Sequence, residues 1–154
     1  MIEVRRGNKG DLPSVLLLIQ ELADYEKASN EVQNTVARME EDGFGSDPIF
    51  KFFVAEKNNQ IVGTAIFYNR YSTWKGRCLY LEDLVVSESE RGQGTGKLLF
   101  DAIVEEAKST NCKVLTWQVL DWNEPAIRFY KRLNADLDAK WINCKLTDEQ
   151  IQNY

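Results

Sequence analysis

The chain has 154 residues, of which 44% are hydrophobic and 28% charged, and this composition predicts one folded domain over residues 1–154 rather than a disordered or fibrous protein. No apolar run approaches the roughly 20 residues of a membrane-spanning helix, residues 1–6 lack the apolar stretch of a secretory signal, and a net charge of −5 without a basic footprint argues against a nucleic-acid partner. The sequence contains no histidine, which excludes Ser-His-Asp and Cys-His catalytic systems and histidine-containing zinc sites, so we expect no metal.

The first elements that the pattern predicts are a strand and two helices. Residues 2–6 alternate between apolar and polar side chains, as a short strand does. Apolar residues recur at three- and four-residue steps over residues 12–23, which predicts an amphipathic helix. A second helix is expected from a cap at residues 34–35 to residue 42, with Gly43 ending it.

A β-hairpin and a further strand follow. Residues 52–56 and 61–71 have the composition of strands, and Asn58 and Asn59 between them tolerate the positive φ of a tight turn. Residues 78–86 form an apolar run of high β propensity. We therefore expect these three strands to be antiparallel neighbours.

In the remainder, helices and strands alternate. A helix opens near Gly96 and ends at Asn111, and residues 114–120 resemble a buried strand. A helix over residues 126–133, a strand over 141–146 and a short tail helix complete the prediction. Hairpins followed by alternating elements predict an α/β (α+β) fold with a mixed, mostly antiparallel central sheet and helices on both faces.

Acidic residues are concentrated in the first third of the chain. Residues 1–50 contain 5 Lys and Arg against 10 Asp and Glu, which accounts for the whole net charge. One interpretation is a solvated helix face, and the other is an acidic rim that attracts a cationic substrate. The three cysteines form an odd, widely spaced set without a CxxC motif, which favours reduced thiols in a cytoplasmic protein.

A glycine-rich segment, Arg91-Gly92-Gln93-Gly94-Thr95-Gly96, lies between the predicted strand 78–86 and the next helix. Glycines allow positive φ, and the first free amides of the helix form a site for an anion such as a phosphate. Leu98 follows Lys97 where a P-loop needs Ser or Thr, and the glycine spacing does not match the dinucleotide fingerprint. A purely structural role for these glycines stays open.

Two motifs resemble those of the GNAT superfamily of N-acetyltransferases. Arg91-x-x-Gly94-x-Gly96 after a strand is similar to its acetyl-CoA signature. Asn123-Glu124-Pro125-Ala126-x-x-Phe129-Tyr130 is similar to its second motif. Further segments, among them Tyr80-Leu81-Glu82-Asp83, resemble the diamine (spermidine/spermine) acetyltransferase branch, and residues 71–77 are most like the thialysine acetyltransferases. Ser72 stands where polyamine-specific members usually carry an Asp, so a thialysine- or lysine-like acceptor is favoured over a polyamine.

The resemblance implies roles for three groups of residues. Contacts with acetyl-CoA, the cosubstrate, are expected from Leu84, Val85, Val86, Arg91, Gly92, Gln93, Gly94, Thr95, Gly96, Lys97, Asn123, Glu124, Pro125 and Ala126. Tyr130 would protonate the departing thiolate and Glu82 would accept the proton of the amine. The acceptor pocket would contain Tyr25, Glu26, Trp74, Glu82 and Trp117.

Structural interpretations of the same residues remain open. Helix periodicity alone favours Tyr130 as a half-buried core aromatic. Glu82 and Asp83 lie inside an apolar strand, where neighbours point to opposite faces, so at most one of them faces a given cleft; either could form a structural ion pair or mark a bulge. For Trp74 and Trp117, packing explains the residue type equally well.

The sequence thus predicts acetyl transfer from acetyl-CoA to a primary amine of a small cationic molecule, by direct attack on the thioester. The alternatives are a protein or peptide N-acetyltransferase and a non-catalytic CoA-binding module. A homodimer is expected from the resemblance alone.

Overall fold

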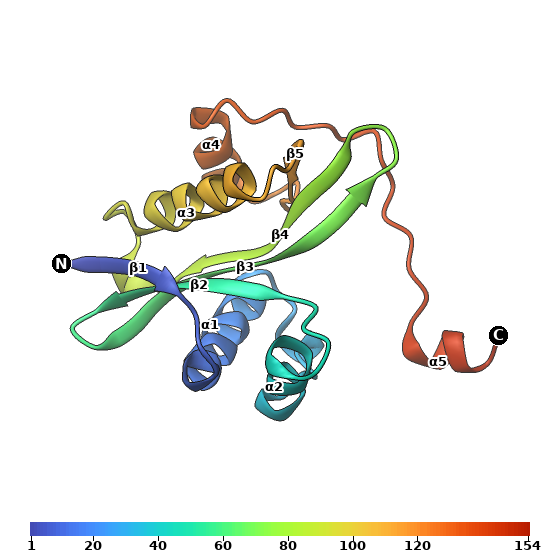
Figure 1. Ribbon diagram of the computed structural model, residues 1–154, viewed down its shortest axis with the longest axis horizontal. Helices are drawn as coiled ribbons and strands as arrows, with labels where there is room; N and C mark the ends of the chain where they lie inside the picture. The colour runs from blue at the N-terminus through green and yellow to red at the C-terminus, as the bar shows by residue number, and fades with distance from the viewer. The chain divides into compact units, whose positions relative to one another are not determined.

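The computed structural model describes residues 1–154 and divides into two compact units, Met1–Gln118 and Val119–Tyr154, each described by itself. In the first unit, five strands form one sheet in the order of the sequence: β1 (Ile2–Arg6), β2 (Lys51–Lys57), β3 (Gln60–Ser72), β4 (Gly76–Val86) and β5 (Val114–Thr116) (Figure 1). Strands β1 to β4 are antiparallel neighbours, and β5 pairs parallel to β4. The predicted mixed, mostly antiparallel sheet is confirmed.

Helices cover both faces of this sheet, as predicted. Helices α1 (Leu12–Tyr25) and α2 (Val36–Phe44) lie on one face, and α3 (Thr95–Ser109) lies on the other (Figure 1). The core beneath α1 and α2 is apolar and contains Leu12, Val15, Met39, Phe52, Val54 and Ile66. On the opposite face Leu99 of α3 packs so closely on Gly63 that a Cβ added there would lie 3.0 Å from Leu99 Cδ1.

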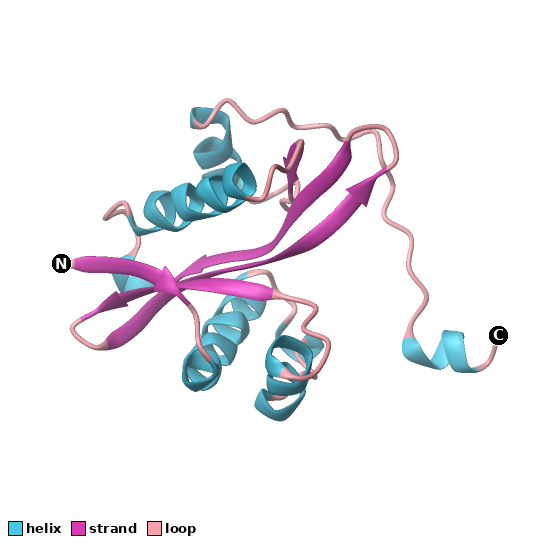
Figure 2. Ribbon diagram, in the orientation of Figure 1, coloured by secondary structure: helices cyan, strands magenta, loops and turns pink.

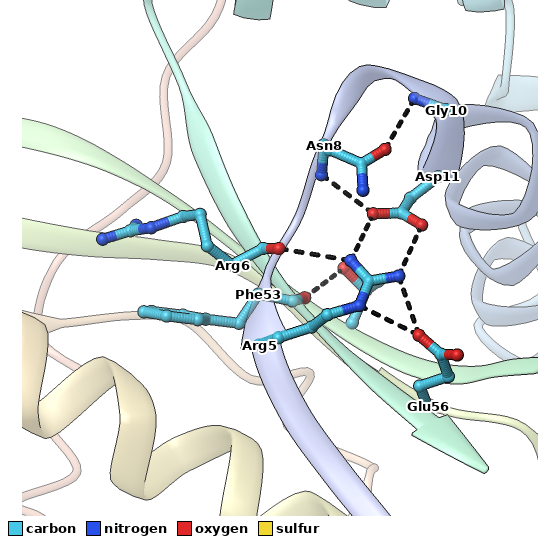
Figure 3. A network of polar contacts seen from close by, with 8 residues as sticks. Arg5, Arg6, Asn8, Gly10, Asp11, Phe53 and Glu56 are labelled. Atoms are coloured by element: carbon cyan, nitrogen blue, oxygen red, sulfur yellow. Dashed lines mark hydrogen bonds and ion pairs between the residues drawn. The ribbon is translucent and has the colours of Figure 1, made fainter. Parts of the chain in front are cut away.

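The start of α1 is tied to the sheet by a polar network around Arg5 of β1 (Figure 3). The guanidinium donates to both carboxylate oxygens of Asp11, at 2.8 and 2.9 Å, and to Glu56 of β2 at 2.9 Å. Asp11 ends the 3-10 turn η1 (Lys9–Asp11) and also accepts from the backbone N–H of Asn8. The hydrogen bond from Arg5 lowers the pKa of Asp11, so the network is held by charge above the acidic range.

Three asparagines adopt the left-handed backbone that the sequence predicts for them. Asn58 and Asn59 have φ of 51° and 61° in the β2–β3 turn, and Asn111 has φ of 57° after α3. The end predicted for the second helix is wrong, because α2 continues through Gly43 and ends when the N–H of Gly45 donates to Glu41 O. The structure has no helix long and apolar enough to cross a membrane.

The second unit contains α4 (Glu124–Arg132) and α5 (Asp148–Gln152), joined by a long loop (Figure 2). Asn123 caps α4, since its side-chain oxygen accepts from Ala126 N at 3.4 Å. At the other end Asn134 has φ of 58°, and the N–H of Ala135 donates to Tyr130 O at 3.2 Å. The predicted helix is therefore confirmed with well-formed ends.

Two strand predictions need correction. Residues 141–146 form no strand: the segment is loop, with Trp141 and Ile142 78% and 88% exposed. A strand requires a neighbouring backbone for its hydrogen bonds, and the residue pattern alone does not supply one. The strand predicted over residues 114–120 ends at Thr116, because β5 pairs with only three residues of β4, Cys78 to Tyr80.

Candidate active site

A β-bulge places Glu82 outside the regular ladder between β3 and β4. Asp83 lies opposite Ile66 and Leu81 lies opposite Phe67, so Glu82 has no residue opposite it. A bulge bends the strand and redirects the side chain of the extra residue. The carboxylate of Glu82 accepts a hydrogen bond from the Tyr68 hydroxyl at 2.8 Å.

Because of this bulge, Glu82 and Asp83 reach the same face of the sheet. Ile66 belongs to the core under α1 and α2, and Asp83 directly opposite it shares that face. Tyr68 is two residues after Ile66 and points the same way, and it holds Glu82. The strict alternation expected from the sequence fails here, so one cleft can use both carboxylates.

A third carboxylate, Glu26, follows the end of α1. Burial raises the pKa of Asp83 to about 6, and the negative charges of Glu82 and Glu26 add to that effect. Burial also raises the pKa of Glu26. We call Glu26, Glu82 and Asp83 the carboxylate cluster; a cluster of this charge favours a cation beside it.

Two tyrosines, Tyr68 of β3 and Tyr80 of β4, form an aromatic pair next to the carboxylate cluster on the β3–β4 hairpin. The rings of Tyr68 and Tyr80 are 5.3 Å apart between centroids. Burial, followed by the hydrogen bond to Glu82, raises the pKa of Tyr68, so its hydroxyl keeps its proton and remains a donor. The guanidinium of Arg70 lies 5.6 Å from the centre of the Tyr80 ring.

The glycine-rich loop connects the 3-10 turn η3 (Glu88–Glu90) to α3 and has the backbone of an anion site. Gly92 and Gly94 have φ of 74° and 86°, and a Cβ on either would meet no atom within 4 Å. The first helical hydrogen bond runs from Leu98 N to Gly94 O, so the amides of residues 95–97 precede it. The Thr95 hydroxyl is buried without a hydrogen-bond partner.

One edge of β4 is open beside this loop. Strand β5 pairs with β4 only as far as Tyr80, whereas β4 continues to Val86 and pairs there with β3 alone. The stretch from Leu81 to Val86 therefore presents backbone donors and acceptors on one side. An extended amide-containing ligand can pair with such an edge.

The two basic side chains of the loop are engaged within the protein. Arg91 donates to Val86 O at 3.0 Å, lies 3.5 Å from a Glu21 carboxylate oxygen and stacks 5.3 Å from the Tyr25 ring centre. Glu21 also accepts from Glu88 N at 2.8 Å. Lys97 pairs with Asp101 one turn along α3. Arg91 and Glu21 thus hold the loop against α1, and the backbone amides of residues 95–97 are the candidate donors of this loop to an anion.

The structure brings together only part of the predicted acceptor pocket. The negative charge of Glu26 contributes to the raised pKa of Asp83, and the ring of the neighbouring Tyr25 stacks with Arg91. Trp74 lies at the tip of the β3–β4 hairpin, is 84% exposed, and is separated from Glu82 by strand of roughly 20 Å. Trp117 packs edge-on against Phe100 of α3, at 5.2 Å between ring centroids, on the opposite face of the sheet.

The remaining predicted residues belong to the second unit. Asn123, Glu124, Pro125 and Ala126 form the cap and first turn of α4, and Tyr130 lies in its last turn. Tyr130 is buried, and its ring is 5.3 Å from that of Phe129.

Sequence reasoning missed Tyr68 and Arg70 and treated Asp83 only as a neighbour of Glu82. Alternation from the buried Ile66 would have placed Tyr68 and Arg70 on the same face of the sheet. The bulge at Glu82 has no glycine or other local marker in the sequence, so the direction of the Glu82 side chain could not be predicted from the sequence.

A separate polar groove of about 520 Å³ contains none of the predicted site residues. Its wall includes Arg5, Asp11 and Glu56, which form the ion-paired network described above. Glu90, also in the wall, pairs with Lys57. Since these charges compensate one another, the groove offers no comparable site for a cation.

Several known proteins are similar to this chain in sequence or in fold. A thialysine N-epsilon-acetyltransferase of Bos taurus is 39% identical over 142 residues, which cover 87% of this chain and 84% of the bovine protein. A spermidine/spermine N(1)-acetyltransferase-like protein 1 of Homo sapiens is 35% identical over 159 residues, covering 97% of this chain and 23% of the human protein. The solved structure of an integron cassette protein from the mobile metagenome of V. cholerae has the same fold, with a TM-score of 0.80 at 22% identity over 99% of this chain and 96% of that one.

The family assignment rests on a match that spans both units. Residues 18–135, from α1 through the end of α4, match the acetyltransferase (GNAT) family. That range includes the carboxylate cluster, the glycine-rich loop and Tyr130. The chain therefore belongs to the GNAT family of acetyltransferases, which are acyl-transferring enzymes.

Proposed function

We propose that this protein transfers the acetyl group of acetyl-CoA to the side-chain amine of a small basic amino acid of the thialysine or lysine type. The observation that carries the proposal is the carboxylate cluster, formed by Glu82 and Asp83 of β4 with Glu26 after α1, next to an open strand edge that leads to the glycine-rich loop. A cation site and a phosphate site at the two ends of one strand edge suit an amine acceptor and a nucleotide-bearing acyl donor.

The loop and the edge fit the donor. Gly92 and Gly94 have left-handed backbone and open space where a side chain would begin, so a diphosphate can approach the backbone of the loop and the amides of residues 95–97 that follow it. We propose that Leu84, Val85 and Val86 pair with the amides of the pantetheine arm, and that residues 123–126 line its other side.

In the proposed reaction, the carboxylate cluster attracts the acceptor as an ammonium ion. Glu82 accepts a proton from it, directly or through water, because an amine with a pKa near 10 is not a nucleophile until that proton leaves. The nitrogen then bonds to the acetyl carbon as the carbon–sulfur bond breaks. Tyr130 gives its hydroxyl proton to the departing thiolate. The attacking nitrogen then loses its second proton, which restores the Tyr130 hydroxyl directly or through water, so the products are an amide and free CoA, and Glu82 releases the first proton to solvent.

The acceptor class follows from the hairpin and from the relatives. A polyamine needs a second anionic group for its second ammonium, and the hairpin offers Ser72 where a carboxylate would serve. The Ser72 hydroxyl is occupied locally, since it accepts from Trp74 N at 3.2 Å and Lys75 N at 3.1 Å. Relatives named for thialysine, an amino acid with a terminal amine, support the same choice.

We further propose that both units form one acetyltransferase domain and that two copies associate. The family match runs across the boundary between the units, which supports the first statement. Exposed apolar side chains in the second unit, with Trp141 and Ile142 nearly fully exposed, support the second. Mass measurement by light scattering at several concentrations tests the association.

The test of the proposed function is a turnover assay that follows the release of CoA thiol. Acetyl-CoA is supplied with thialysine, lysine, spermidine, 1,3-diaminopropane or a peptide with a free amine. We expect the basic amino acids to give the highest kcat/KM. A preference for the peptide would favour a protein acetyltransferase. Tight acetyl-CoA binding without transfer to any acceptor would reject catalysis altogether.

A further inference from the structure

Arg70 presents a guanidinium that has no acidic partner in the structure. It forms no ion pair and no hydrogen bond, and its one polar contact is the stacking over Tyr80 at 5.6 Å. By contrast, Arg5, Arg6 and Arg91 each lie within 4.0 Å of a carboxylate. An exposed arginine held by an aromatic ring keeps all five N–H donors for a ligand.

Its position relates Arg70 to the acceptor site. Arg70 lies two residues after Tyr68 on β3, so both side chains are on the face that carries the carboxylate cluster. The Tyr80 ring lies near both groups. The Arg70 guanidinium is 5.6 Å from its centre, and the Tyr68 ring, whose hydroxyl donates to Glu82, is 5.3 Å from it between centroids. Glu82 follows Tyr80 by two residues, roughly 7 Å along a strand.

A cation and an anion are therefore set at the two ends of one aromatic surface. We propose that Arg70 binds the α-carboxylate of the acceptor while the carboxylate cluster receives its side-chain amine, so that the site selects amino acids over diamines. The inference rests on the proposed function, and it assigns to Arg70 a role in specificity. Arg70 lies opposite Cys78, four residues before Glu82 and so roughly 13 Å from it along the strand, and its stacking on Tyr80 brings the guanidinium toward the carboxylate cluster, which shortens the span that a lysine molecule has to bridge.

The physical basis is charge complementarity with a fixed geometry. A guanidinium binds a carboxylate through two parallel hydrogen bonds, which are stronger than neutral ones and directional. Stacking on Tyr80 restricts the arginine before binding, so less conformational entropy is lost when the ligand arrives. A diamine would instead bring its second ammonium toward the guanidinium, and like charges at that distance disfavour binding.

The test compares lysine with cadaverine, which is lysine without its carboxylate, in the wild-type protein and in two Arg70 variants. Wild type is expected to show the lower KM for lysine. Arg70→Gln should raise the KM for lysine about tenfold and leave that for cadaverine unchanged or lower. Arg70→Lys keeps the positive charge but loses the two parallel N–H donors, so its KM for lysine should lie between those of wild type and Arg70→Gln.

Arg77→Gln is the matched control. Arg77 is an exposed arginine of the same hairpin, but it lies opposite Tyr71 and therefore on the other face of the sheet. It should change neither KM. Thermal unfolding of each variant verifies that the hairpin is intact.

Three results would overturn the inference. Equal changes for lysine and cadaverine in Arg70→Gln would show that Arg70 does not sense the carboxylate, while the proposed acetyl transfer would stand. A wild-type preference for cadaverine would reject selection for amino acids in the same way. Transfer to neither amine, nor to thialysine, would remove the proposed function together with the inference.

Discussion

At the scale of single residues, the site depends on how close three carboxylates lie to one another. Asp83 is half-buried beside Glu82 and Glu26, and Tyr68 holds Glu82 through its hydroxyl. Burial is the largest cause of the raised pKa of Asp83, and the negative charges of Glu82 and Glu26 add to it. A bound ammonium would reduce the repulsion among the three carboxylates. The arrangement therefore costs free energy in the unliganded protein and favours binding of a cationic acceptor.

The raised pKa of Asp83 predicts how stability varies with pH. A pKa of about 6 in the folded state, above the usual 3.8, means that the neutral acid favours folding. This contribution is complete below the unfolded pKa and is lost as pH rises through 6. We expect the free energy of unfolding of wild type, relative to Asp83→Asn, to fall by up to about 2 kcal/mol between pH 4 and pH 7.

Urea unfolding of both proteins across that range measures the difference. Asp47→Asn, the same substitution on an exposed loop, serves as the control and should track wild type at every pH. A constant difference between wild type and Asp83→Asn would mean that Asp83 ionises normally in the folded protein.

At the scale of elements, the glycine-rich loop and the hairpin turn offer a matched pair of glycines. Gly94 and Gly76 have φ of 86° and 99°, and a Cβ on either would meet no protein atom within 4 Å. Alanine is strained equally at both, so each substitution should lower stability by about 1 kcal/mol. Gly94→Ala should also weaken acetyl-CoA binding about tenfold, because its methyl group occupies the space above the free amides.

Calorimetric titration with acetyl-CoA separates the two effects. Gly76→Ala should bind acetyl-CoA as wild type does, since Gly76 begins β4 at the tip of the hairpin, far along the strand from the loop. If both variants lost affinity to the same degree, the effect would be one of stability and the loop would not be the binding site.

Much at this scale was predictable because its causes are local. The caps at Thr35 and Asn123 and the left-handed asparagines at 58, 59, 111 and 134 act within a few residues of themselves. The open edge of β4, by contrast, could not be predicted from the sequence. It exists because β5 ends at Thr116, and the length of a paired strand depends on its neighbour as much as on its own residues.

At the scale of the whole molecule, the proposed chemistry requires residues of both units. Glu82 belongs to the first unit and Tyr130 to the second. We expect Tyr130→Phe to lower kcat on the order of a hundredfold or more, the usual contribution of a general acid, with the affinity for acetyl-CoA unchanged. Tyr154→Phe, at an exposed terminal tyrosine, is the control.

Steady-state kinetics and equilibrium binding of acetyl-CoA distinguish the possible results. A near-normal kcat in Tyr130→Phe would reject the acid role and make Tyr130 a packing residue. Loss of acetyl-CoA affinity together with turnover would indicate instead that the hydroxyl supports the binding site.

The sequence by itself determined the family, the succession of helices and most strands, and the left-handed turns at asparagine and in the glycine-rich loop, because motifs, periodicity and caps depend on residues close together in the chain. Only the tertiary structure decided that Glu82 leaves the ladder, that Asp83 shares its face, that Arg70 stands over Tyr80 and that residues 141–146 form no strand. Each of these features depends on which strands pair and in what register. Residues far apart in the sequence become neighbours only when the sheet forms.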